Sequence, residues 1–220
     1  MVYLSKSKYC GLWQCPKIAW LRKYKPETSR LDDSVLARME AGNEVGALAR
    51  SLYGDFVDIT AYTGENPDLK KMMENTRREM EKGTPVICEA SFEYNGLYCA
   101  VDILRKDGDG WAIYEVKSSS KHGGDSDDKP VYIADIAYQK YVLENCGVKV
   151  SAVYLVCLNG DYVFDGTLDI HKLFTVSDVA EAVAVEWEKI ETNLLVAERL
   201  LLSPNEPKID LFAGCKKPYL

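Results

Sequence analysis

The sequence lacks long apolar runs, low-complexity tracts and internal repeats. No stretch approaches the roughly 20 apolar residues that a membrane-spanning helix needs, so we expect no membrane partner. The first residues, MVYLSKSKYCGLWQCPK, contain no continuous apolar segment of the kind found in secretory signals. We therefore expect a cytoplasmic protein. Its 220 residues, 47% hydrophobic and 28% charged, are enough for one substantial globular core.

Positive charge is scarce. The chain has 27 Lys and Arg against 34 Asp and Glu, a net charge of −7. This balance argues against a protein that coats nucleic acid without specificity. It does not exclude a nuclease, because a carboxylate-rich metal site adds negative charge of its own. In a reducing cytosol we expect the seven cysteines to stay free or to bind metal.

Periodicity and turn signals predict the order of the elements. Apolar residues at three- and four-residue steps predict helices over 32–54 and 66–85, and two glycine-rich turns divide 85–119 into three strands. A helix over about 133–145, an apolar strand over 150–158 and a long last helix over about 176–202 follow. This order predicts an α/β sandwich with a mixed central sheet flanked by helices. We expect one domain over 1–220, with its core at about 32–202 and flanking segments at 1–31 and 203–220.

The meander contains three charged residues in unusual surroundings. Asp102 interrupts the apolar stretch AVDIL, and Glu115 follows the apolar stretch WAIY. Glu115 and Lys117 are two residues apart and so share one face of their strand. A hairpin with its turn near 106–110 brings Asp102 level with 114–116. Acids embedded in apolar runs tend to be paired or bound to metal, because an unpaired buried carboxylate is costly.

Two interpretations of this group remain open at this point. Two carboxylates beside a lysine suit hydrolysis with Mg²⁺ or Mn²⁺, in which the metal activates a water and the ammonium orients it. The alternative is an ordinary cross-strand ion pair. The spacing of the residues favours neither.

The stretch AVDIL followed by EVK resembles the D-x(n)-E-x-K signature of the PD-(D/E)XK nuclease superfamily. It is most similar to the RecB-like branch, which includes the CRISPR-associated RecB-like exonucleases. The start of the chain, LSKSKY and QCPK, also resembles the N-terminal RecB-like module of a family of uncharacterised bacterial proteins. The resemblance implies a restriction-endonuclease-like fold. It further implies that Asp102, Glu115 and the Val116 carbonyl bind Mg²⁺ or Mn²⁺, and that Lys117 positions the nucleophilic water.

The same resemblance implies further site residues. The branch carries a Q-x-x-x-Y motif on the following helix, which Gln139 begins here. The expected tyrosine position is Leu143, and Tyr141 or Tyr138 stands in for it. The branch also places a metal-binding residue on the first core helix, where Glu44 is the match. A solvated helix position is the alternative for Glu44.

Glu89, in VICEASF, is a further acid in an apolar strand. It either supports the site or faces solvent by simple alternation with Ser91 and Glu93. Alternation is the favoured interpretation, and it turns both Cys88 and Ala90 toward the core.

Some RecB-like nucleases hold a 4Fe-4S cluster with one early and three late cysteines. By resemblance, Cys15 matches the early ligand and Cys215 the first late ligand, and Cys10 is a further candidate. Four thiolates are required, so we expect such a cluster only in a longer chain with a C-terminal remainder.

A basic and aromatic segment near the start gives candidate DNA contacts at Lys17, Trp20, Arg22 and Lys23. Such mixtures stack bases and hold phosphates. An amphipathic helix with snorkelling lysines is the equal alternative. His122 lies in a polar loop after the serines, where a surface histidine is the commoner case.

Together these features predict a metal-dependent DNA nuclease. We expect an exonuclease that acts on single-stranded DNA or DNA ends, with no covalent intermediate. The alternative is a catalytically weak nuclease-fold module that binds DNA or serves a structural role in a longer protein.

Overall fold

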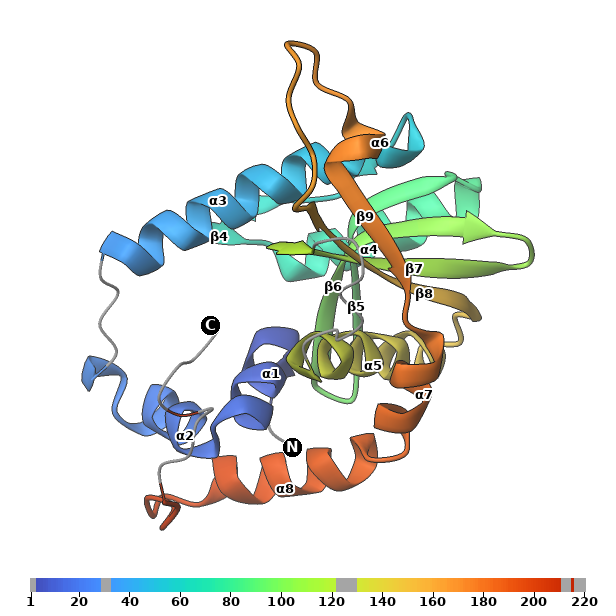
Figure 1. The fold of residues 1–220 in the computed structure, drawn as a ribbon. Helices are drawn as coiled ribbons and strands as arrows, with labels where there is room; N and C mark the ends of the chain where they lie inside the picture. The colour runs from blue at the N-terminus through green and yellow to red at the C-terminus, as the bar shows by residue number, and fades with distance from the viewer. Residues whose placement is uncertain (1–2, 29–32, 122–129, 211–214, 216–220) are drawn as a thin grey trace.

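A mixed sheet with helices on both faces forms the centre of the fold (Figure 1). The computed structural model describes residues 3–28, 33–121, 130–210 and 215. Within this part the strands of the central sheet are β1 (Leu4–Ser5), β2 (Val57–Asp58), β5 (Val86–Tyr94), β6 (Leu97–Asp107), β7 (Gly110–Lys121), β8 (Val150–Asn159) and β9 (Phe174–Asp178). Their order is β2-β5-β6-β7-β8-β9, with β1 beside β6. The α/β class and the mixed sheet are as predicted.

The helices come from all parts of the chain. They are α1 (Lys6–Gln14), α2 (Pro16–Tyr24), α3 (Asp33–Ala49), α4 (Leu69–Lys82), α5 (Pro130–Asn145), α6 (Ile170–Leu173), α7 (Ala180–Trp187) and α8 (Ile190–Leu202), with short 3₁₀ helices η1 (Pro26–Thr28) and η2 (Arg50–Tyr53). A separate ribbon joins β3 (Tyr62–Thr63) to β4 (Asn66–Pro67). None of the helices in the described ranges has the length and apolar character that crossing a membrane requires.

The predicted meander is confirmed. Strands β5, β6 and β7 pair in sequence and antiparallel, with Leu104 opposite Ile87 on one side and Ile113 on the other. The first turn has positive φ at both central residues, 50° at Asn95 and 80° at Gly96. These are the angles that an Asn-Gly hairpin turn requires.

The helix predicted over 66–85 is shorter than expected. Asn66–Pro67 pairs with β3, and Asp68 caps α4 by accepting a hydrogen bond from the Lys71 N–H at 2.9 Å. The far end is as predicted, because Gly83 adopts the left-handed conformation that ends a helix.

The long helix predicted over 176–202 is wrong. Residues 174–178 form β9, an edge strand that pairs antiparallel with β8 and places Val176 opposite Val156. Phe174 and Val176 alternate with the polar residues Thr175 and Ser177, and this period of two is typical of a strand. The rest of the predicted helix is divided into α7 and α8. Helix α7 packs on α5, whereas α8 packs on α1 and α2.

The N-terminal segment belongs to the same core and is not a flanking addition. Strand β1 pairs parallel with β6, and α1 packs on α5, where the Tyr9 and Tyr138 rings stack 4.7 Å apart. The larger apolar cluster lies on this face of the sheet, and a smaller one lies on the opposite face under η2. The expected core boundary near residue 32 therefore leaves out part of the sheet.

The sheet divides at one point. Strands β6 and β7 pair from their turn as far as Ile103 opposite Tyr114, and β7 then continues beside β8 alone. Strand β1 pairs with β6 at Leu97 and Tyr98, on the part of β6 that β7 has left. We call this point of separation the fork.

Candidate active site

Asp102 and Glu115 lie at the fork, one on each strand just beyond the last paired residues. The backbone N–H of Val116 donates to Asp102 Oδ2 at 2.8 Å, so a side chain replaces the lost strand partner. The predicted approach of Asp102 to 114–116 is therefore confirmed.

Glu115 and Lys117 share a face of β7, as alternation predicts. The Lys117 Nζ atom lies 2.6 Å from Glu115 Oε1. Glu115 is only 1% exposed and points toward α5, whereas Tyr114 and Val116 face the smaller cluster on the other side. Burial of an ionised acid is tolerable here because cations and donors surround it.

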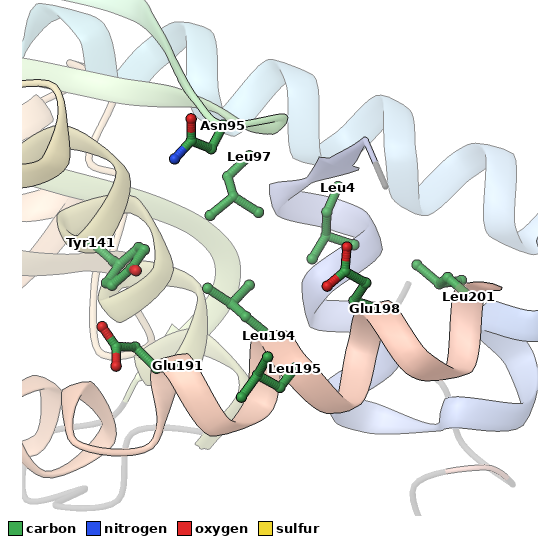
Figure 2. Close-up of a pocket in the computed structure, with 9 residues that line it drawn as sticks. All are labelled: Leu4, Asn95, Leu97, Tyr141, Glu191, Leu194, Leu195, Glu198 and Leu201. Carbon is green, nitrogen blue, oxygen red and sulfur yellow. The ribbon is translucent and has the colours of Figure 1, made fainter. Parts of the chain in front are cut away.

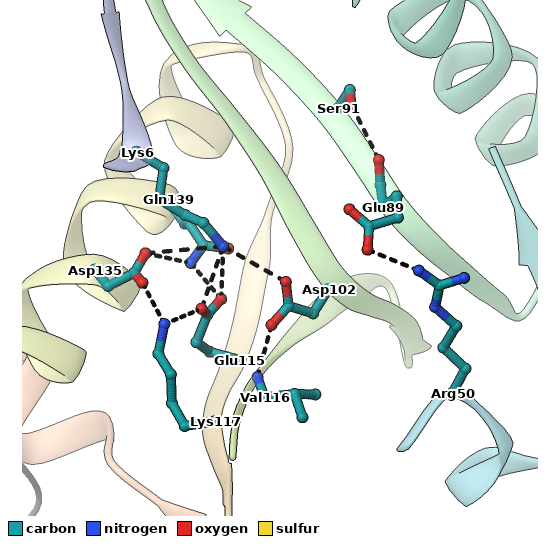
Figure 3. A network of polar contacts seen from close by, with 10 residues as sticks. All are labelled: Lys6, Arg50, Glu89, Ser91, Asp102, Glu115, Val116, Lys117, Asp135 and Gln139. Carbon is teal, nitrogen blue, oxygen red and sulfur yellow. Dashed lines mark hydrogen bonds and ion pairs between the residues drawn. The ribbon is translucent and has the colours of Figure 1, made fainter. Parts of the chain in front are cut away.

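Helix α5 contributes two residues one turn apart, Asp135 and Gln139 (Figure 3). Gln139 Nε2 donates to Glu115 Oε2 at 2.7 Å and to Asp135 Oδ1 at 2.9 Å. Asp135 Oδ2 also accepts from Lys117 Nζ at 2.8 Å. Sequence reasoning found Gln139 and missed Asp135. The available signal was an acid four residues before Gln139, among apolar residues in the first half of the helix.

Lys6 enters the same centre from the start of α1. Its Nζ atom lies 3.1 Å from Glu115 Oε2, 3.5 Å from Asp102 Oδ1 and 4.0 Å from Asp135 Oδ1. Sequence reasoning missed this residue, because nothing in the local pattern connects it to a strand more than 100 residues away. We call Lys6, Asp102, Glu115, Lys117, Asp135 and Gln139 the carboxylate centre.

The two carboxyls at the fork differ in their affinity for protons. Burial and, after it, the negative charge of Glu115 raise the pKa of Asp102 to about 7, against the lowering effect of the Lys6 and Lys117 charges. Burial also acts to raise the pKa of Glu115, but the ammonium groups of Lys117 and Lys6 outweigh it and hold that pKa below its usual range. Glu115 is therefore the permanently ionised member of the pair.

Both lysines of the centre stay protonated. Burial acts to lower the pKa of Lys117, yet the charges of Asp135 and Glu115 leave it raised. The pKa of Lys6 is likewise raised well above its usual value, by Asp102 first and then by Asp135. Their side chains are 22% and 18% exposed, and Asp102 is 25% exposed, so solvent reaches this side of the centre.

Glu89 lies on β5 opposite Asp102 of β6, between the paired residues Cys88 and Ala90. Its φ of 58° is a left-handed conformation that is rare for such a side chain. Cys88 and Ala90 are both buried as expected, although this kink places them in different apolar clusters. The expected alternation is wrong at Ser91, which is buried and does not face solvent. Glu89 is half-buried and accepts from Arg50 Nη2 at 2.9 Å.

Three other predicted residues lie outside the carboxylate centre. Glu44 is exposed on α3. Tyr138 is buried and donates a hydrogen bond to the Leu4 carbonyl. Tyr141 lines an apolar pocket of about 350 Å³ between α5 and α8 (Figure 2), with its ring 5.6 Å from that of Trp187. The glutamine of the Q-x-x-x-Y motif therefore lies in the carboxylate centre, whereas Tyr138 and Tyr141 contact other parts of the chain.

Two of the three candidate iron–sulfur ligands, Cys15 and Cys215, lie together, and Cys10 is not bonded to either of them. Cys15 and Cys215 form a disulfide across a sequence separation of 200, so for these two the expectation of free or metal-binding thiols is wrong. Cys10 is a free thiol buried in the larger apolar cluster, and burial raises its pKa well above the usual value. A thiol of that kind behaves as a core residue.

The candidate DNA contacts are engaged within the chain. Lys17 pairs with Glu206 at 2.9 Å, and the buried Trp20 donates to the Ser203 carbonyl at 3.0 Å. Lys23 donates to the Leu201 carbonyl, and Arg22 also has a partner. These contacts favour the alternative interpretation of this segment, an amphipathic helix that packs on the rest of the chain. His122 lies outside the described residues.

The carboxylate centre fits a hard divalent cation by its donors. In the described part of the chain, no three His, Cys, Asp or Glu side chains form a metal cage. Mg²⁺ needs only one or two carboxylates, because it keeps several waters. Asp102 and Glu115 already converge on one cation, the Lys6 ammonium. Gln139 Oε1 is buried and has no hydrogen-bond partner among the described residues, so it could accept from a metal-bound water.

Comparison with known proteins gives distant structural matches. No family model and no curated protein sequence matches the chain. Among solved structures, an alkaline exonuclease from Laribacter hongkongensis is similar with a TM-score of 0.46 and 12% identity, over 90% of this chain and 89% of its own. The protein SSO0001 is similar with a TM-score of 0.42 and 8% identity, over 88% and 75%. At these scores the likeness supports no statement about function.

Proposed function

We propose that this protein is a metal-dependent nuclease of the RecB-like PD-(D/E)XK type that hydrolyses phosphodiester bonds at DNA ends. The observation that carries the proposal is the meeting of Asp102, Glu115 and Lys117 at the fork, with Lys117 Nζ 2.6 Å from Glu115. An ordinary cross-strand ion pair needs neither a second acid nor a buried glutamine. The shared contacts of Gln139 with Glu115 and Asp135 therefore favour a built site.

Asp102 and Glu115 would hold Mg²⁺ or Mn²⁺, together with the carbonyl of Val116, the residue that follows Glu115. The ion supplies Lewis-acid polarisation of the phosphate and a bound water of lowered pKa. Gln139 fixes the Glu115 carboxylate by its hydrogen bond at 2.7 Å, so the acid cannot turn away. Glu44, Tyr141, Cys10, Cys15 and Cys215 have no part in this mechanism.

Lys117 acts as an ammonium ion. Its raised pKa disfavours the role of general base at neutral pH, because a base must first lose its proton. It instead donates hydrogen bonds that orient the attacking water and offset the charge that develops on the phosphate oxygens. The water oxygen would form a new bond to phosphorus while the bond to the leaving oxygen breaks, with no covalent enzyme intermediate. The attacking water would lose its proton to solvent, and the leaving oxygen would take one from solvent.

A second candidate is a nuclease-fold module that binds DNA with weak or no turnover. One specific observation favours it, since a lysine ammonium already fills the space between the two carboxylates. Because Lys6 already offsets the negative charge of Asp102 and Glu115, these carboxylates do not require a metal ion as counter-ion.

The test is degradation of end-labelled single- and double-stranded DNA, and of RNA, with Mg²⁺, Mn²⁺ or EDTA. We expect metal-dependent cleavage that is lost in Asp102→Ala and Lys117→Ala proteins. The matched controls are Asp109→Ala and Lys149→Ala, an exposed ion pair at the far hairpin turn, which should keep full activity. A ladder of products separates exonuclease from endonuclease action. Binding without cleavage by the wild type would reject the enzyme and support the second candidate.

A further inference from the structure

Lys6 is a cation of the carboxylate centre to which the proposed mechanism gives no role. Its ammonium touches both carboxyls at the fork, 3.1 Å from Glu115 Oε2 and 3.5 Å from Asp102 Oδ1. It also lies at the limit of an ion pair with Asp135. A lysine placed among three acids from three different elements is not a surface charge that happens to lie nearby.

The chain around Lys6 is anchored so that the side chain must point into the fork. The Leu4 N–H donates to the Gly96 carbonyl at 2.9 Å, and the Leu4 carbonyl accepts from Tyr138. Ser5 then caps α1 by accepting from the Lys8 N–H. Lys6 is thus the first residue of a capped helix that follows directly from a paired strand.

Charge balance explains why the fork holds a cation. Three acids, Asp102, Glu115 and Asp135, face two ammonium groups, and Lys117 pairs with only two of them. Lys6 is the ion-pair partner of Asp102. Without it that half-buried carboxylate would face Glu115 with no direct counter-ion, which is unfavourable.

The same oxygens cannot serve an ammonium and a metal ion at once. Mg²⁺ binds carboxylate oxygens at about 2.0–2.1 Å and repels a second cation held by the same atoms. We propose that Lys6 is an internal counter-ion that occupies the metal position, and that it must leave the fork before Asp102 and Glu115 bind a divalent cation. This inference rests on the proposed metal-dependent nuclease. The 18% exposure of the Lys6 side chain gives the ammonium a route to solvent.

The first test is metal affinity rather than activity. Mn²⁺ binding is measured by calorimetry on the wild type, Lys6→Met and Lys8→Met. Lys8 is exposed on the same helix, over the ring of Tyr3, and its substitution changes the net charge equally. We expect Lys6→Met to bind Mn²⁺ more tightly by about tenfold or more, equal to ~1.4 kcal/mol, and Lys8→Met to match the wild type. Equal or weaker binding by Lys6→Met would overturn the inference.

The second test needs no substitution, so it holds even where Lys6→Met fails to fold. The wild type is treated with an amine-acylating reagent with and without saturating Mg²⁺, and Lys6 is compared with Lys8 by mass spectrometry. We expect Lys6 to react far more slowly than Lys8 without metal and to approach it with metal. An unchanged Lys6 rate at saturating Mg²⁺ would contradict displacement.

The two tests separate this inference from the proposed function. If wild type and Lys6→Met bind Mn²⁺ equally, Lys6 is not the competitor and the metal-dependent nuclease stands. If neither binds Mn²⁺, both the metal site and the role of Lys6 are rejected.

Discussion

The Val116 N–H donates to Asp102 Oδ2 at 2.8 Å, at the point where β6 and β7 separate. The hydrogen bond satisfies a backbone donor that has lost its partner strand. It also fixes the direction of the carboxyl, so that the second oxygen, Oδ1, faces Lys6. The division of the sheet is therefore what orients the acid.

Asp102→Asn should separate folding from catalysis. The amide keeps an oxygen for the Val116 N–H and removes a charge that is costly to bury, so we expect a melting temperature at or above that of the wild type. Activity should fall by at least ~100-fold, because a metal ligand is lost. Asp102→Ala leaves the N–H unpaired and should lose ~1–3 kcal/mol of unfolding free energy. Equal destabilisation by both variants in thermal and denaturant unfolding would show that the hydrogen bond from Val116 to Asp102 does not stabilise the fold.

Asp135→Asn should impair turnover through Lys117. Asp135 Oδ2 holds the ammonium at 2.8 Å, and partners of this kind typically change activity by ~10–100-fold. We expect kcat to fall in that range while KM for DNA changes little, as measured by steady-state kinetics. Glu144→Gln, on the same helix and paired with Lys140, is the matched control. A rise in KM with unchanged kcat would instead place Asp135 in substrate binding.

Gln139→Leu should destabilise the protein. The substitution keeps the volume but removes donors to Glu115 and Asp135, and hydrogen bonds to charged groups contribute ~1.5–3 kcal/mol each. Urea denaturation should show a loss of at least that size. Asn145→Ala, an exposed amide near the end of α5, should cost much less. A loss below ~0.5 kcal/mol would show that the contacts of Gln139 do not support the fold.

Glu79 should make stability depend on pH in acid. Its hydrogen bond from Lys82, followed by that from Thr84, lowers the pKa of this carboxyl to about 2. A folded-state pKa below the unfolded value stabilises the protein above the unfolded value, and the effect disappears as pH falls through the folded one. The wild type should therefore be more stable than Glu79→Gln at pH 6, and the difference should shrink between about pH 4.5 and 2. A difference in unfolding midpoint that is constant with pH would exclude this origin.

Alanine substitutions at Gly83 and Gly42 should change the free energy of unfolding in opposite directions. Gly83 ends α4 with a φ of 77°, and an alanine there adopts a left-handed conformation at a cost of ~1–2 kcal/mol. Gly42 lies inside α3 with open space around it, so alanine should stabilise the protein by ~0.5–1 kcal/mol. Denaturant unfolding of both variants gives the comparison. Destabilisation by Gly42→Ala would mean that this face of α3 is covered.

Local patterns predicted most elements of the central fold. The Asn95-Gly96 turn, the end of α4 at Gly83 and the alternation of Glu115 with Lys117 each follow from rules that act over a few residues. The last helix was mispredicted because Val176 suits either a strand or a helix. Only the exposed edge of β8 decided between them.

The sequence by itself determined the meander, the acid at each side of its hairpin and the lysine beside Glu115, because hairpin register and strand alternation are local. Tertiary structure alone decided that the sheet divides there and that Lys6 and Asp135 complete the centre. It also turned Tyr141 away and kinked β5 at Glu89. These outcomes depend on contacts between elements distant in the chain, where packing and charge compensation choose among conformations that local preference leaves equal.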